Sequence, residues 1–284
     1  MQILESIAEL HQYLQQQRNA GCSIGLVPTM GNLHTGHMAL IKTALDECDI
    51  VVATLFVNPT QFGPNEDYDK YPRSYDADKA LLEAQHCSAL FVPAVTELYP
   101  TGLIGNTAVH ASAISERHCG ASRPGHFDGV CTVVCKLFNL VNPDKAFFGK
   151  KDFQQLLIIK TMVNDLCMPI QVIGIETERD GTGLALSSRN NYLDQGQKKQ
   201  ARILYQTLQQ TADALSRHSD MNFAQLEAEA RGKISSAGLQ VDYFTICNAS
   251  TLLPATADDR NLVILTAAYL GETRLIDNIS LTIN

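Results

Sequence analysis

The residues best suited to chemistry gather in residues 27–38, which read Val-Pro-Thr-Met-Gly-Asn-Leu-His-Thr-Gly-His-Met. Two glycines and a His-x-Gly-His pair, His34 and His37, stand in this stretch. Because they are three residues apart, the two imidazoles share one face if the first helical turn includes them. Beside a positive helix end, neutral imidazoles that donate hydrogen bonds to phosphate are the reasonable state. The stretch predicts a nucleotide site; taken alone, a turn with two incidental histidines is the alternative.

The flanking sequence predicts that this stretch joins a strand to a helix. Residues 23–27 form a short apolar run, and residues 38–48 carry apolar side chains at helical spacing. A second apolar run, residues 50–57, suits a strand buried on both faces of a parallel sheet. Ligands of such sheets bind beyond the carboxyl ends of the strands, where the histidines would lie.

Strands and helices alternate through the first 176 residues. Ile3, Ile7, Leu10 and Leu14 recur at helical spacing and predict an amphipathic first helix. Further strands are predicted at residues 90–92, 146–148 and 172–175, and further helices at residues 130–141 and 153–165. Right-handed crossovers make a Rossmann-like parallel sheet the simplest topology, so the predicted fold class is α/β.

A polar loop, residues 60–75, follows the second strand and is long enough to be a lid or binding loop. We expect Ser74 to cap the next helix, with Asp76 and Asp78 in its first turn. From residue 177 onward, long polar helices are followed by three segments typical of strands, residues 241–247, 262–269 and 273–279. The sequence therefore predicts two domains, residues 1–176 and a smaller α+β domain of residues 177–284.

The bulk composition excludes several classes of protein. The net charge of −8 argues against a nucleic-acid partner, which needs a basic footprint. Eight cysteines without a Cys-x-x-Cys pair are typical of reduced, cytoplasmic proteins. No apolar run approaches the roughly 20 residues that span a bilayer, and no signal peptide is recognisable, so we expect a cytoplasmic protein with no membrane partner.

Other polar groups follow predicted strands and should open onto the same sheet edge as the histidines. These are Asn58 with Gln61, and the run Lys151, Asp152, Gln154 and Gln155. The glutamines can orient hydroxyl or carboxylate groups, although loop glutamines are usually solvated. Adjacent lysines such as Lys150 and Lys151 are more often a plain surface pair, so shared location carries this prediction more than any one motif.

Two more loops carry cations. Ser187, Ser188 and Arg189 offer two hydroxyl donors and a bidentate cation, which suit a pyrophosphate; a simple polar turn is the alternative. Arg123 and His126 either meet a small anion or stabilise their own loop. The histidine spacings fit no zinc-ligand pattern.

Taken together, residues 27–38, 56–62, 122–127, 148–155 and 184–190 resemble the ordered motif set of the pantothenate synthetase family, the pantoate-β-alanine ligases. The resemblance covers nearly the whole chain and is weakest after about residue 195. It implies a homodimer that joins (R)-pantoate to β-alanine with Mg-ATP, through an acyl adenylate, and releases AMP and pyrophosphate.

The same resemblance implies a role for each matching residue. The catalytic residues would be His37, the proton donor, with His34, Lys151 and Arg189. ATP would be bound by Met30, Gly31, Asn32, Leu33, His34, Thr35, Gly36, His37, Gly149, Lys150, Lys151, Asp152, Glu178, Leu186, Ser187, Ser188 and Arg189. The substrates would be bound by Asn58, Gln61, Arg123 and Gln155, with Arg123 on the β-alanine carboxylate. Asp78, or its neighbour Asp76, would reach Mg²⁺ through water.

Three positions depart from the family pattern. Lys150 stands where Glu is usual, Thr35 where an acidic residue is common, and Thr182 where Asp usually precedes Gly183. These changes bear on affinity and on the conformation of the turn at residues 180–183, rather than on the reaction.

Two other functions remain open. Another nucleotidyltransferase acting on a phosphorylated precursor would need more cations than the neutral set Asn58, Gln61 and Gln155 supplies. A catalytically silent nucleotide-binding protein would not need both histidines together with Lys151 and Arg189. A tRNA synthetase relative is disfavoured by the acidic charge balance.

Overall fold

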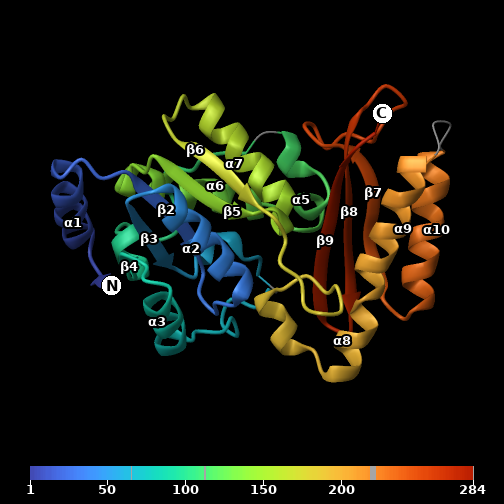
Figure 1. Ribbon diagram of the computed structural model, residues 1–284, viewed down its shortest axis with the longest axis horizontal. Coiled ribbons are helices and arrows are strands. Elements are labelled where there is room, and N and C mark those ends of the chain that lie inside the picture. The colour runs from blue at the N-terminus through green and yellow to red at the C-terminus, as the bar shows by residue number, and fades with distance from the viewer. Residues whose placement is uncertain (65, 112, 218–221, 284) are drawn as a thin grey trace. The chain divides into compact units, whose positions relative to one another are not determined.

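The computed structural model describes residues 1–64, 66–111, 113–217 and 222–283 (Figure 1). The chain forms two compact units, Met1–Lys150 with Gln155–Glu176, and Lys151–Gln154 with Thr177–Asn284. The predicted domain boundary after residue 176 stays a prediction. All eight cysteines are free thiols. Within the described ranges, no helix is long and apolar enough to cross a membrane.

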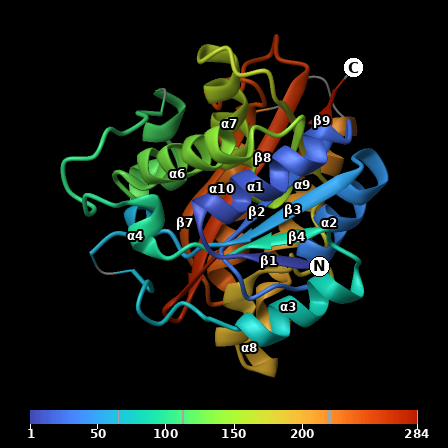
Figure 2. The same cartoon turned by 90° about the vertical axis from the view of Figure 1, so that its left-hand side faces the viewer.

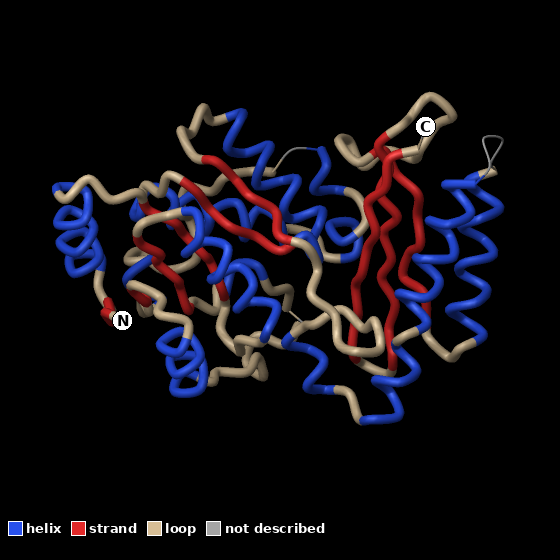
Figure 3. The backbone as a smooth tube through the Cα atoms, in the orientation of Figure 1, coloured by secondary structure: helices blue, strands red, loops and turns tan. Residues whose placement is uncertain are grey.

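The first unit is built on a six-stranded parallel sheet in the order β1-β4-β3-β2-β5-β6 (Figures 1 and 3). Its strands are β1 Gln2–Leu4, β2 Ile24–Thr29, β3 Ile50–Leu55, β4 Ala89–Phe91, β5 Lys145–Gly149 and β6 Gln171–Ile175. Strands β2 and β3 are buried at nearly every position, which suits their continuous apolar runs. The predicted Rossmann-like parallel sheet is confirmed.

Helices connect these strands and cover the sheet. They are α1 Ile7–Asn19, α2 Thr35–Glu47, α3 Tyr75–Ala84, α4 Val95–Leu98, α5 Cys119–Ser122, α6 His126–Val141 and α7 Phe153–Asp165, with 3₁₀ turns η1 Pro59–Gln61, η2 Ala113–Glu116 and η3 Lys150–Asp152. Helix α2 packs on β2, β3 and β5 and contacts α3, whereas α6 packs on β2 and contacts α1. Right-handed crossovers in opposite directions along the sheet place α2 and α6 on opposite faces.

The strand order reverses between β2 and β5. From β2 the chain proceeds to β3 on one side, and from β5 it proceeds to β6 on the other. Beyond the carboxyl ends of β2, β3 and β5 lie the turn at residues 30–34, η1 and Lys150. Such a switch point is where open parallel sheets bind ligands, so the topology brings the predicted site segments of this unit to its functional edge.

The prediction that Ile3 belongs to the first helix is wrong. Residues Gln2–Leu4 form an edge strand paired with β4 (Figure 2). The helix begins only after Ser6, which forms a capping box with Glu9. Ile3 lies four residues before Ile7 and mimics the helical repeat, and a three-residue strand is too short to show a period of its own.

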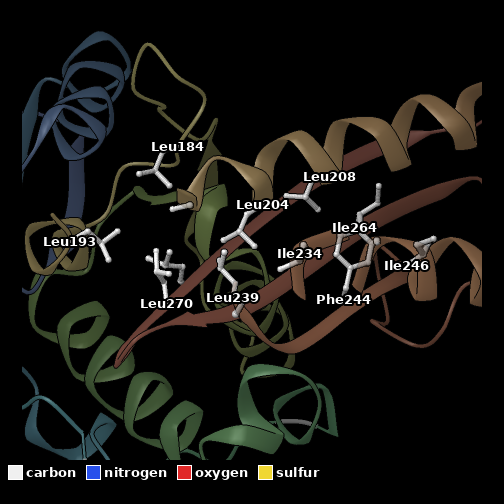
Figure 4. Close-up of a cluster of buried hydrophobic side chains, with 14 of the residues drawn as sticks. Leu184, Leu193, Leu204, Leu208, Ile234, Leu239, Phe244, Ile246, Ile264 and Leu270 are labelled. Atoms are coloured by element: carbon white, nitrogen blue, oxygen red, sulfur yellow. The ribbon is translucent and has the colours of Figure 1, made fainter. Parts of the chain in front are cut away.

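The second unit is a three-stranded antiparallel sheet in the order β7-β8-β9 with helices against it (Figure 3). Its elements are η4 Ser188–Tyr192, α8 Gln195–Ala201, α9 Ile203–Arg217, α10 Phe223–Ser236, β7 Gln240–Asn248, β8 Asn261–Leu270 and β9 Thr273–Thr282. Leu204 and Leu208 of α9 pack in one buried cluster with Phe244 and Ile264 of the sheet (Figure 4). The predicted α+β architecture and its three closing strands are confirmed.

Candidate active site

The turn after β2 reverses the chain through two residues with left-handed backbone. Gly31 has φ +87° and Asn32 has φ +52°. Glycine suits the first of these positions because a Cβ there would also lie 3.1 Å from Oδ2 of Asp78. The turn therefore depends on a close approach between its own backbone and the α3 carboxylate.

Asp78 acts as an internal anion bound to this turn. It is 2% exposed, and its Oδ2 and Oδ1 accept the backbone N–H groups of Asn32 and Leu33 at 2.8 and 2.7 Å. Ser74 stands at the N-cap of α3, but its side chain makes no capping bond there, and its hydroxyl donates to the Asp78 carboxylate at 3.1 Å instead. The observed partners of Asp78 are thus protein donors, and its predicted contact with Mg²⁺ stays a prediction.

His34 and His37 form a capping box at the start of α2. His34 is the N-cap residue, and its Nδ1 accepts the N–H of Gly36 at 3.2 Å. In return, Nδ1 of His37 accepts the N–H of His34 at 3.3 Å. The ring centroids lie 4.1 Å apart, as expected for neighbours across one turn. Because both Nδ1 atoms accept, each neutral ring carries its proton on Nε2.

Asn58 organises the turn η1 after β3. It is 1% exposed; its Nδ2 donates to Oε1 of Gln61 and to the carbonyl of Gly129, both at 3.1 Å. Its Oδ1 accepts the hydroxyl of Tyr99 at 2.9 Å. With both ends of the amide bonded inside the protein, Asn58 fixes the orientation of its neighbour, and its own predicted contact with substrate stays a prediction.

Gln61 links η1 to the histidine turn. Its Oε1 faces Asn58, so its Nε2 points the other way and reaches Sδ of Met30 at 3.1 Å. The residue is 8% exposed. The structure therefore brings together the turn after β2 and the turn after β3, as shared location at the sheet edge predicts.

Arg123 is engaged by a carboxylate of its own chain. Its Nε and Nη2 donate to the two oxygens of Glu66, each at 2.6 Å. Burial raises the pKa of Glu66, but the hydrogen bonds and charge of Arg123 outweigh it and hold that pKa below its ordinary value. These contacts stabilise the loop, and the predicted contact of Arg123 with a small anion stays a prediction.

The two lysines after β5 have different surroundings. Lys150, in the first unit, stands where Glu is usual in the family and forms an ion pair with Glu176. Lys151, in the second unit, lies 3.6 Å from Asp152, and its carbonyl accepts Nδ2 of Asn278 on β9 at 2.8 Å. Its backbone is therefore held by the small sheet.

The segment Ser187 to Arg189 opens the 3₁₀ turn η4. Ser187 is its N-cap and accepts the N–H of Arg189 at 3.3 Å, and Asn190 donates back to the carbonyl of Ala185 at 2.9 Å. These bonds fix the backbone that carries the two serines and Arg189 at the start of one short turn. Strand β9 contacts η4 and also bonds the backbone of Lys151. The residues of the second unit that are predicted to bind phosphate are therefore held by the same strand.

Asp180 organises the turn at residues 180–183, in which Thr182 stands where Asp is usual in the family. Asp180 accepts the N–H and the hydroxyl of Thr182 at 2.8 and 2.6 Å and the N–H of Leu184 at 3.1 Å. Gly183 has φ +93°, and a Cβ there would lie 2.6 Å from the ring of Tyr205. Both the backbone and the side chain of Thr182 are thus bonded to Asp180.

Sequence patterns miss several supporting residues. Glu66 binds Arg123, and Tyr99 binds Asn58. Asp277 binds Arg179 through two hydrogen bonds of 2.6 and 2.8 Å. The partners in these contacts are 57, 41 and 98 residues apart. No local spacing signals a contact at such separation.

A parallel sheet with a histidine capping box at its switch point defines an α/β protein whose ligand site lies beyond the carboxyl ends of the strands. The sequence profile described as Pantoate-beta-alanine ligase matches residues 2–280. The chain belongs to this family.

Relatives match over their full length. A pantothenate synthetase of Idiomarina loihiensis is 53% identical, covering 99% of this chain and 98% of the relative, and one of Pseudomonas fluorescens is 52% identical over all of both chains. The crystal structure of pantothenate synthetase from Thermus thermophilus has a TM-score of 0.92 at 41% identity, covering 98% of this chain and 99% of that one. The Francisella tularensis ligase, solved with β-γ ATP and β-alanine, has a TM-score of 0.80 at 35% identity, covering 98% and 97%.

Proposed function

We propose that the chain catalyses the ATP-dependent ligation of (R)-pantoate and β-alanine to pantothenate, through a pantoyl adenylate. The observation that carries the proposal is the reciprocal cap of His34 and His37. In this cap both Nδ1 atoms accept, so the Nε2 atoms are the donors, and they belong to a turn at the switch point of the parallel sheet in a chain of the pantoate-β-alanine ligase family. The crystal structure of the Francisella ligase with β-γ ATP and β-alanine supports the choice of substrates.

The first step activates an unreactive acid. A carboxylate is a poor electrophile at neutral pH, so a pantoate carboxylate oxygen attacks the α-phosphorus of ATP and the bond to the bridging oxygen breaks. Pyrophosphate leaves with that electron pair. Nε2–H groups of His34 and His37 donate to phosphate oxygens, with His37 as the proton donor, and so stabilise the charge that develops.

The second step forms the amide. The β-alanine amine attacks the acyl carbonyl, the carbon–oxygen bond to the phosphate breaks, and AMP departs while the amine loses a proton. Both steps depend on positioning, which supplies roughly 7 to 11 kcal/mol when two reactants are held in line.

The cations and hydroxyls of the second unit are proposed to hold the triphosphate. The support is chemical: Lys151 is a point charge, Arg189 a planar fork, and Ser187 and Ser188 are hydroxyl donors fixed at one turn. The backbone around Gly149, Asp152, Glu178 and Leu186 is proposed to frame adenine and ribose. The carbonyl of Glu178 already accepts the N–H of Leu186 at 2.9 Å, which fixes that stretch.

Gln61 and Gln155 are proposed to bind pantoate. Asn58 turns the Gln61 amide so that its oxygen faces inward. Nε2, which contacts Sδ of Met30, has a second N–H, and this group is proposed to donate to the hydroxy acid. Gln155, half-buried in the first turn of α7, would supply the second amide.

Mg²⁺ and a homodimer are proposed on the family resemblance. Among the described residues no three His, Cys, Asp or Glu side chains gather into a metal site. Mg²⁺ in ATP enzymes is commonly held by phosphates with few protein ligands, so it would arrive with the nucleotide. The buried Asp78 carboxylate, bonded to three protein donors, does not fit direct coordination. Sedimentation of the purified protein tests the dimer.

The proposed function is tested by ATP–pyrophosphate exchange with candidate acids. We expect (R)-pantoate alone to support exchange and the addition of β-alanine to release AMP. Exchange with a phosphorylated acid instead would favour another nucleotidyltransferase, and ATP binding without turnover would favour a silent nucleotide-binding protein. Lys151→Met should lower exchange about 10² to 10³-fold, the loss that follows removal of one charge-stabilising donor.

A further inference from the structure

The loop after η1 is tied to the segment before α6 by a half-buried ion pair. Glu66 lies in the loop, and Arg123 ends the short helix α5 that precedes α6. Both oxygens of Glu66 accept from Arg123 at 2.6 Å, and the two side chains are 25% and 16% exposed. A planar guanidinium matches a carboxylate in this two-bond geometry, so the pair fixes direction as well as distance.

The same cluster holds the backbone of Gln61. Nη2 of Arg123 donates to the carbonyl of Gln61 at 3.3 Å, and Nδ1 of His126 contacts that carbonyl at 2.7 Å. Nη1 of Arg123 lies 2.8 Å from Nε2 of His126. Because a guanidinium only donates, Nε2 of His126 accepts and its Nδ1–H donates to Gln61.

These bonds occupy most of the Arg123 side chain. Two N–H groups go to Glu66, one to His126 and one to Gln61, which is four of the five that a guanidinium has. A two-bond grip on a substrate carboxylate needs two N–H groups. Arg123 therefore cannot bind the β-alanine carboxylate in that way while the Glu66 pair is formed.

We propose that Glu66, Arg123 and His126 form a positioning cluster that holds Gln61 in place for pantoate and takes no direct part in binding β-alanine. This rests on the proposed function, in which the Gln61 amide binds pantoate. The cluster fixes the backbone of Gln61 from one side, and Asn58 fixes its side chain from the other. With neither part able to rotate, the amide is held ready for its ligand, which lowers the cost of binding.

The test is pantoate-dependent ATP–pyrophosphate exchange without β-alanine, using Arg123→Lys and Glu66→Gln. A lysine keeps the charge but cannot reach Glu66, His126 and Gln61 together. We expect each variant to raise the KM for pantoate about tenfold and to leave the KM for ATP within about twofold. The double variant should be little worse than Arg123→Lys alone, because Glu66→Gln weakens only a contact that Arg123→Lys already removes.

His126 provides a rescue test that folding alone would not explain. The Nδ2 of asparagine stands near the position of Nδ1 in histidine, so His126→Asn retains a donor for the Gln61 carbonyl, whereas His126→Ala does not. We expect the KM for pantoate to stay closer to that of the wild type in the asparagine variant. Equal KM values in these two variants would contradict the role of the Nδ1 donor.

Matched controls separate the cluster from general support of the loop. Arg73 braces the same loop through the carbonyls of Tyr68 and Tyr71, so Arg73→Lys should leave the KM for pantoate unchanged. Thermal unfolding of each variant checks that it is folded. If Arg123→Lys does not fold, the KM values for pantoate of Glu66→Gln and of the two His126 variants test the proposal. No change in the KM for pantoate, or a rise confined to the KM for β-alanine when the complete reaction is assayed, overturns the positioning cluster. Absence of pantoate-dependent exchange in the wild type would refute the proposed function instead.

Discussion

The backbone N–H of His34 donates to Nδ1 of His37 over 3.3 Å, so the second histidine of the motif completes the helix cap of the first. In an ordinary capping box this position holds Glu or Gln. The His37 imidazole thus has two roles. Its Nδ1 caps the helix, and its Nε2–H is proposed to donate to the phosphates of ATP.

The two jobs of His37 can be separated by substitution. His37→Gln retains an acceptor for the His34 N–H but loses the imidazole, whereas His37→Ala loses both. We expect turnover to fall about 10² to 10³-fold in both variants. Only the alanine variant should lose the cap, at about 1 kcal/mol in urea denaturation. Near-normal turnover of His37→Gln would remove His37 from the mechanism.

Asp78→Asn tests the internal anion of the turn. An amide offers one oxygen to the two N–H groups of Asn32 and Leu33, and its NH₂ faces a donor. Leaving a buried donor without an acceptor costs about 1 to 3 kcal/mol, which urea denaturation measures. The KM for ATP should rise because the turn carries His34. Asp76→Asn is the control, since Asp76 is exposed in the same helical turn, and a similar loss there would point to a general charge effect.

Gly129→Ala tests how closely α6 must approach η1. A Cβ at Gly129 would lie 2.3 Å from the carbonyl oxygen of Thr60 and 2.8 Å from Cα of Gln61, and both are backbone atoms. We expect a loss of about 1 to 3 kcal/mol in stability from overpacking, with a higher KM for pantoate. Gly232→Ala, exposed in α10 with nothing within 4 Å, should gain about 0.5 to 1 kcal/mol. A neutral Gly129→Ala would contradict this close contact.

Acid should release the Glu66 pair. The folded-state pKa of Glu66 lies below its ordinary value of 4.5, because Arg123 outweighs the effect of burial. A group with a lowered folded pKa contributes stability that is fully present above its unfolded pKa and is lost as pH falls through the folded one. The difference in urea midpoint between wild type and Glu66→Gln should therefore be constant above about pH 5 and shrink below it. If the difference in urea midpoint between wild type and Glu66→Gln does not fall in acid, the charge of Glu66 does not contribute to the stability of the fold.

Local sequence determined much of this protein. Long apolar runs such as residues 50–57 predict buried parallel strands, because side chains on both faces of such a strand must be apolar. The three closing strands, β7 to β9, are likewise predicted from the sequence. The ordered motifs around His34, Gln61 and Ser187 identify the family, which the profile match confirms.

Only the tertiary structure decided which groups meet. Whether Ile3 pairs with β4 or continues a helix depends on a strand more than eighty residues away, and Arg123 binds Glu66 across 57 residues. Asp78 likewise turns inward to the backbone of the histidine turn, 46 residues earlier. Periodicity and motif spacing describe neighbours along the chain, whereas these hydrogen bonds depend on how the crossovers bring distant turns to one sheet edge.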